Sequence, residues 1–85
     1  MRYSIWYEQA TPNEFGYYRR DCIATEDDNG APTYLAWDTV EQAEEVLLAL
    51  QRSGIIRHRA WIIRNHDGWI GGTVKEFNPV APATV

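Results

Sequence analysis

Apolar residues recur at helical spacing in the middle of the chain. Thr39-Val40-Glu41-Gln42 fits a capping box in which Thr39 caps the helix and Gln42 reaches back. Asp38 and Glu41 offer the same arrangement one residue earlier, and Gly54 is suited to the left-handed residue that ends a helix. The stripe expected to face the core consists of Val40, Ala43, Val46, Leu47 and Leu50. The segment therefore predicts one amphipathic helix.

The pattern after this helix predicts a β-hairpin. Arg59 to Arg64 is expected to form one strand, and Trp69 to Phe77 is expected to return beside it. The residues between them, Asn65-His66-Asp67-Gly68, are expected to form the turn. Residues directly opposite each other share a face, so pairing of Arg64 with Trp69 would set both faces of the hairpin.

We assign one of these two faces to the core beneath the helix. This face carries Trp61, Ile63, Ile70 and Val74. The other face is then open to solvent, and it carries His58, Arg64, Trp69, Thr73 and Lys75, with Ala60, Ile62 and Gly71 between them. A slip of one residue would exchange the faces, because side chains alternate along a strand.

Three further strands are expected before the helix. Tyr3 to Glu8 alternates, with Ile5 inward and Trp6 outward. Tyr17 to Thr25 is a second strand whose faces the pattern leaves open. Thr33 to Trp37 is a third strand, which follows an acidic turn.

These elements predict an α+β fold in the order β-β-β-α-β-β. An antiparallel sheet of four to five strands carries the single helix on one face. A chain of 85 residues is expected to form one core, which we place in residues 1–77. Residues 78–85 contain two prolines and no periodicity, so we expect a flexible tail.

Composition adds an expectation about the surface. Aromatic residues make up 13% of the chain, with four Trp and five Tyr, so some rings are expected outside the core. The formal net charge of −4 favours solubility and weakens the case for nucleic acid. Cys22 is the only cysteine, and neither a signal peptide nor an apolar run of membrane length is present. We therefore expect a soluble cytoplasmic protein with no membrane contact.

Candidate catalytic residues do not form a site in this arrangement. His58 and His66 could be the acid–base pair of a small hydrolase or ribonuclease. They lie, however, at opposite ends of one expected strand, roughly 25 Å apart at about 3.3 Å per residue. Nothing near Cys22 indicates a lowered thiol pKa, and one cysteine with two separated histidines is no recognisable zinc site. We expect a protein that is not an enzyme and needs no cofactor or metal, with the hydrolase as an alternative.

The expected open sheet face is the leading candidate for binding. Its residues are Trp6, His58, Arg64, Trp69 and Lys75. Aromatic rings beside cations concentrate at protein-binding hot spots, and they also stack the bases of single-stranded nucleic acid. The negative net charge places a protein partner ahead of nucleic acid. An ordinary solvated sheet face is a further alternative.

The solvent side of the helix offers a second, weaker patch. Glu41 and Glu45 make it acidic, and Leu48 lies away from the apolar stripe. A domain that is acidic on the helix and more basic on the sheet would permit a homodimer.

The opening Met1-Arg2-Tyr3 and the segment Asp38 to Glu45 resemble the start of HicB-like antitoxins. The Pro-Asp-x-Pro-Gly segment typical of that group is absent after Tyr17-Tyr18, so this resemblance assigns no family. Small size, acidity and the lack of catalytic motifs also resemble phage and mobile-element proteins, including inhibitors of host defence. The sequence thus predicts a small non-catalytic binding protein that covers a surface of a macromolecular partner, and a phage or mobile-element inhibitor or regulator is one form that such a protein could take.

Overall fold

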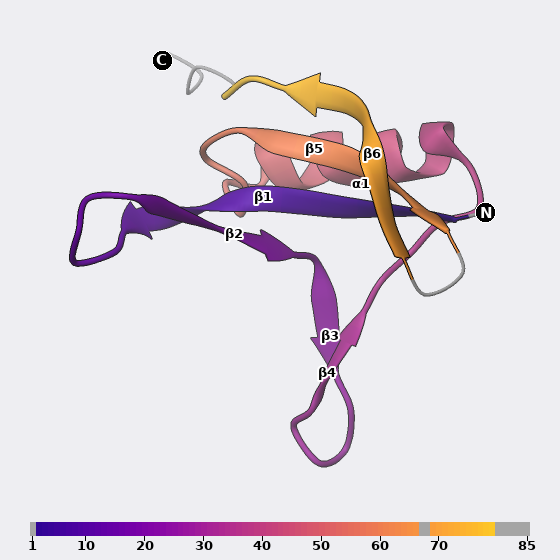
Figure 1. Cartoon of the computed structure of the whole chain (residues 1–85), viewed down its shortest axis with the longest axis horizontal. Helices are drawn as coiled ribbons and strands as arrows, with labels where there is room; N and C mark the ends of the chain where they lie inside the picture. The colour runs from indigo at the N-terminus through magenta and orange to yellow at the C-terminus, as the bar shows by residue number, and fades with distance from the viewer. Residues whose placement is uncertain (1, 67–68, 80–85) are drawn as a thin grey trace.

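The computed structural model describes residues 2–66 and 69–79, and at residues 10, 66, 69 and 70 it describes the backbone alone. A four-stranded antiparallel sheet in the order β2-β1-β5-β6 carries one helix, and a two-stranded sheet is formed by β3 and β4 (Figure 1). The α+β class predicted from the sequence is confirmed. In chain order the elements are β1 (Arg2–Pro12), β2 (Tyr18–Cys22), β3 (Ala24–Glu26), β4 (Pro32–Tyr34), α1 (Val40–Arg52), β5 (Ala60–His66) and β6 (Trp69–Phe77).

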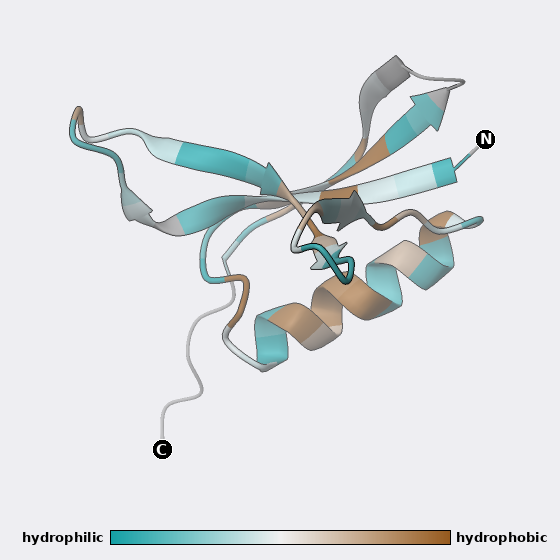
Figure 2. Ribbon diagram, turned by 90° about the horizontal axis from the view of Figure 1, so that it is seen from below, coloured by the Kyte–Doolittle hydropathy of each residue, from teal (hydrophilic) through white to brown (hydrophobic). Residues whose placement is uncertain are grey.

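The core lies between α1 and one face of the two central strands, β1 and β5. Ile5 of β1 pairs with Ile62 of β5, so the two side chains leave the sheet on the same side, and both are fully buried. In Figure 2 the helix, with several brown stretches, lies along this side of the sheet. The buried core cluster consists of Ile5, Ala43, Leu47, Ile56, Ala60 and Ile62.

Both ends of the predicted helix are confirmed. The backbone N–H of Gln42 donates to Oγ1 of Thr39 at 3.1 Å, which makes Thr39 the N-cap and excludes the earlier start. Gly54 follows the helix with a φ of 80°, a left-handed conformation that favours glycine. The N–H of Ile56 then donates to the carbonyl of Leu50, and the buried Ile56 side chain joins the core.

The second predicted strand, Tyr17 to Thr25, is divided in the structure. Its first part is β2 in the main sheet, and its last part is β3, which pairs with β4 in the separate hairpin. Ile23 lies between them, and its N–H donates to the carbonyl of Ile5 while its carbonyl accepts from Leu35. The chain leaves the main sheet here, and the β3–β4 hairpin projects from the body (Figure 1).

The predicted register of the last hairpin is wrong. Trp69 pairs with His66, two residues beyond the expected Arg64, and irregularities shift the register again on both sides of Ile63. The expected turn was too long, because the strand continues through Asn65 and His66 instead of ending at Arg64. At its far end β5 pairs Ala60 with Phe77.

The predicted faces of β5 are also exchanged. Ala60 and Ile62 lie beneath α1, whereas Trp61 pairs with the outward-facing Trp6 on the opposite face. The alternation misled the assignment because three successive residues, Ala60, Trp61 and Ile62, are all buried. A strand that is buried on both faces does not show which face carries the helix.

The end of β1 extends beyond β5. Pairing between these strands ends at Tyr7 opposite Ala60, whereas β1 continues to pair with β2 as far as Pro12 opposite Tyr18. We call residues 9–18 the β1–β2 arm, which projects from the sheet in Figure 1.

The structure describes only the first two residues of the expected C-terminal tail, Asn78 and Pro79. The carbonyl of Asn78 accepts a hydrogen bond from Nε2 of Gln51 at 3.1 Å, so the first residue after β6 is held against α1. The rest of the predicted tail beyond Pro79 lies outside the described residues.

Candidate partner-binding face

The candidate site is the sheet face opposite α1, which the described elements leave uncovered (Figures 1 and 2). We call it the open face. The residues that form it come from β1, β2, β4, β5 and β6, and they are Ser4, Trp6, Arg20, Cys22, Tyr34, Trp61, Ile63, Asn65 and Thr73.

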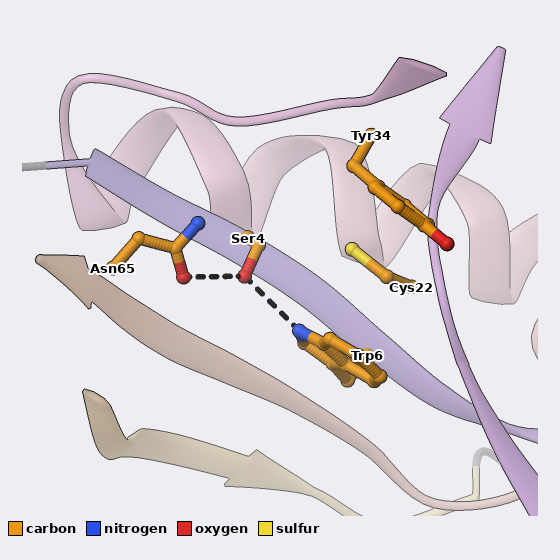
Figure 3. Close-up of a pocket in the computed structure, with 5 residues that line it drawn as sticks. All are labelled: Ser4, Trp6, Cys22, Tyr34 and Asn65. Carbon is orange, nitrogen blue, oxygen red and sulfur yellow. Dashed lines mark hydrogen bonds between the residues drawn. The ribbon is translucent and has the colours of Figure 1, made fainter. Parts of the chain in front are cut away.

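Ser4 and Trp6 reach the open face because they flank the inward Ile5 in β1. Trp6 Nε1 donates to Ser4 Oγ at 3.1 Å, and Ser4 Oγ donates to Asn65 Oδ1 at 3.0 Å (Figure 3). These bonds satisfy the hydroxyl of Ser4, which is only 2% exposed, and they fix the indole of Trp6 on the sheet. The orientation of the indole is therefore fixed within the chain itself.

Two cavities adjoin each other on this face, and both use the ring of Trp6. One has a volume of about 290 Å³ and is lined by Ser4, Trp6, Cys22, Tyr34 and Asn65 (Figure 3). The other has a volume of about 230 Å³ and is lined by Trp6, Arg20, Trp61, Ile63 and Thr73. These volumes lie just below the roughly 300 to 1,000 Å³ of small-molecule pockets.

Two arginines lie against the ring of Trp61. The guanidinium carbon of Arg20 is 4.2 Å from the ring centroid, and that of Arg59 is 5.5 Å from it. Arg59 also forms ion pairs with Glu8 at 3.3 Å and with Glu76 at 3.5 Å. These contacts explain how Trp61 is only 6% exposed although it lies opposite the helix.

The predicted set of sheet residues is not brought together, and its placement needs correction. Of that set, Trp6 lies on the open face. Lys75 pairs with Ile62 on the helix side, where its Nζ contacts Glu44 Oε1 at 2.7 Å. Arg64 pairs with Tyr3, so it too lies on the side of α1.

The two remaining members of that set lie elsewhere. The ring of His58, which precedes β5, is centred 4.6 Å from the ring of Tyr18 in the β1–β2 arm. The side chain of Trp69 lies outside the described part of the chain, although its backbone pairs with His66.

The residues of the predicted helix patch are exposed in the structure. Leu48 is 36% exposed, and Glu41 and Glu45 are exposed beside it. Glu44, on the same helix, is partly covered and engaged by Lys75. Whether this patch binds anything stays a prediction.

The described residues include some of the candidates for acid–base or metal chemistry. No three His, Cys, Asp or Glu side chains among them converge in a way that could hold a metal ion. His58 lies two residues before β5, whereas His66 is the last residue of β5 and its side chain is not described. Burial raises the pKa of the Cys22 thiol, which disfavours the thiolate needed for nucleophilic attack.

Comparisons with protein-family models, with curated proteins and with solved structures found no match to this chain. In the described part of the chain, no helix has the length and apolar character needed to cross a membrane.

The sequence indicated only part of the open face. Alternation in β1 correctly placed Trp6 outward, and the same alternation would have placed Ser4 beside it. Trp61 and Ile63 were assigned to the wrong face. Tyr34 and Arg20 carried no signal, because their approach to Trp6 and Trp61 depends on tertiary pairing.

Proposed function

We propose that this chain is a small non-catalytic binding protein that acts by covering a surface of a protein partner with its open face. The observation that carries this proposal is the grouping of Trp6, Trp61 and Tyr34 around two adjoining cavities on an uncovered sheet face. Trp, Tyr and Arg are the residues in which binding energy concentrates at protein interfaces. The hydrogen-bonded indole of Trp6 further reduces the entropy lost on binding.

The surrounding charges favour a protein over nucleic acid. Glu8 and Glu76 form ion pairs with Arg59 beside the open face, and the chain carries a formal net charge of −4. The turn of the β3–β4 hairpin, which also carries Tyr34, is acidic through Asp27 and Asp28. Phosphate groups approaching the face would meet these carboxylates, because nucleic-acid affinity depends on cations that neutralise phosphates.

A comparison of two exposed tyrosines tests the proposal. Tyr34 lines the first cavity and is 67% exposed, whereas Tyr17 is 73% exposed and lies in the β1–β2 arm. Each is changed to Ala in tagged full-length protein, and partners are captured from the source cells and quantified by mass spectrometry. Tyr34→Ala should lower recovery of a specific protein by about tenfold, while Tyr17→Ala should leave it unchanged.

Other results of this capture would contradict the proposal. Equal recovery with Tyr34→Ala and the unmodified chain would remove the open face as the contact. Loss with Tyr17→Ala alone would place the contact on the arm. Recovery of RNA or single-stranded DNA without protein would favour the nucleic-acid alternative.

We further propose that the protein works in a reducing compartment such as the cytoplasm, as an inhibitor or regulator encoded by a phage or mobile element. The support is its single cysteine, which has no internal partner for a disulfide, together with its small size and acidity. Expression in the source cells during phage challenge checks this role. An unchanged outcome with and without the protein would contradict it.

A further inference from the structure

The two arginines on Trp61 differ in how their charges are compensated. Arg59 forms ion pairs with two carboxylates, those of Glu8 and Glu76. Arg20 is exposed and lies opposite Glu8 in the β1–β2 register, but Glu8 pairs with Arg59, and no carboxylate among the described side chains lies within ion-pair distance of Arg20. The open face therefore presents one cation whose donors are not used by an acidic side chain.

The position of Arg20 suits it to receive an anion. Its guanidinium carbon lies 4.2 Å from the Trp61 ring centroid, which is a stacking distance. When a guanidinium stacks on an aromatic ring, its N–H donors stay in the guanidinium plane, and from there they can bind both oxygens of a carboxylate. Stacking also restrains a long side chain that would otherwise lose entropy on binding.

The cavity beside Arg20 indicates which side chain should lie next to the carboxylate in a ligand. Arg20 lines the cavity of about 230 Å³ together with Trp6, Trp61 and Ile63, which supply apolar surface. An occupant that fills this cavity and pairs with Arg20 needs an apolar side chain next to a carboxylate. A nucleic-acid backbone, which carries one phosphate per nucleotide, fits less well than a single carboxylate, because Glu8 lies opposite Arg20 and Glu76 lies opposite Trp61.

We propose that the open face recognises a protein segment in which an Asp or Glu adjoins an aromatic or aliphatic residue, with Arg20 binding the carboxylate. This inference rests on the proposed function, since it names the partner chemistry for the same face. Trp6, Trp61 and Ile63 hold the apolar side chain, and Arg20 selects the acidic neighbour.

A pair of small probes tests this chemistry without knowledge of the partner. Acetyl-Phe-Asp-amide carries the carboxylate, and acetyl-Phe-Asn-amide is its uncharged isostere. Each is titrated into the nitrogen-15-labelled full chain, and the indole N–H signals of Trp6 and Trp61 are followed by NMR. The acidic probe should bind about fivefold more tightly than the isostere, as expected for one exposed charge pair.

Neighbouring residues in β2 provide the matched control. Arg19 and Arg20 are both exposed, and successive residues of a strand point to opposite faces. Arg20→Gln should abolish the preference for the acidic probe, and Arg19→Gln should preserve it. Thermal unfolding of both variants verifies that they fold.

The outcomes separate this inference from the proposed function. Equal binding of the two probes, or a preference that survives Arg20→Gln, overturns the role of Arg20, while movement of the Trp6 and Trp61 signals still supports the face. No response to either probe overturns the inference, and the Tyr34→Ala capture experiment then decides the function by itself. Stronger shifts with an oligothymidine probe than with the acidic dipeptide would overturn it in favour of nucleic acid.

Discussion

Ile62 and Ile63 are adjacent in β5 and lie on opposite faces of the sheet. Ile62 is fully buried beneath α1, whereas Ile63 is partly exposed beside the second cavity of the open face. The same chemical change at these positions should therefore have different costs, which allows a direct test of how the faces are assigned.

We expect Ile62→Ala to lower the free energy of unfolding by about 2 to 5 kcal/mol, because it leaves a cavity in the core. Ile63→Ala should cost clearly less, since part of that side chain is already in contact with water. Urea unfolding followed by far-UV circular dichroism measures both. A larger loss for Ile63→Ala would show that the helix covers the other face.

The reactivity of Cys22 depends on its half-buried place in the first cavity. Burial raises the pKa of the Cys22 thiol above its ordinary value of 9.0. Alkylation by iodoacetamide should consequently be slow at neutral pH and should still be accelerating at pH 9.0, because only the thiolate reacts. Rates measured across this range in folded protein and in concentrated urea test this. A plateau below pH 9.0 in the folded protein would be inconsistent with a buried thiol.

Elements that depend on local signals were predicted well. The helix begins directly after its N-cap Thr39 and ends before Gly54, as the capping box and the glycine indicated, because both signals act within a few residues. The division of Tyr17 to Thr25 was not predictable from alternation. It depends on Ile23, whose backbone bonds to β1 on one side and to Leu35 on the other.

The N-cap of α1 gives a prediction at the scale of one element. Thr39→Ala removes the acceptor for the N–H of Gln42 and should lower the free energy of unfolding by about 1 kcal/mol. Thr39→Ser retains a hydroxyl and should recover most of this loss. Thermal or urea unfolding of the two variants gives the comparison, and equal stability of Thr39→Ala and the unmodified chain would contradict the capping role.

The tip of the β1–β2 arm presents two exposed rings on an ordered loop. Phe15 and Tyr17 are 76% and 73% exposed, and the backbone N–H groups of both donate to Oδ1 of Asn13. Gly16 between them has a φ of 85°, which suits glycine at the turn.

Replacing both rings of this tip by Ser should change the free energy of unfolding by no more than about 0.5 kcal/mol, because little apolar surface is lost from the core. Denaturant titration of the Phe15→Ser, Tyr17→Ser double variant measures the change. A loss of several kcal/mol would mean that these rings are buried in the folded protein in solution.

At the scale of the whole molecule, the α+β class and the single helix layer followed from the sequence, whereas the faces of β5 and its register with β6 did not. The class depends on periodicity and turn residues, which a sequence displays directly. The faces depend on which side of a doubly buried strand meets α1, and Ala60, Trp61 and Ile62 are buried on either choice. Because the sequence does not show which side of β5 meets α1, it could not predict which residues of β5 lie on the open face.

Removing the last hairpin should prevent folding of what remains. A chain ending at His58 keeps α1, β1 and β2 but lacks β5, which provides Ala60 and Ile62 to the core. We expect such a chain to show no cooperative thermal transition by circular dichroism, because most of the apolar cluster has lost its partners. A cooperative transition would show that β5 is dispensable.

Ser4 and Asn65 share a hydrogen bond across β1 and β5 although they are 61 positions apart in the chain. On the ribosome, β1 emerges well before β5 and stays without this central neighbour until β5 has been synthesised. Long-range pairing of this kind slows folding, and it also means that Trp6 and Trp61, which are cross-strand partners, cannot meet until β5 has emerged. A chain whose synthesis stops before β5 would therefore lack both cavities of the open face, because each is lined by a residue of β5.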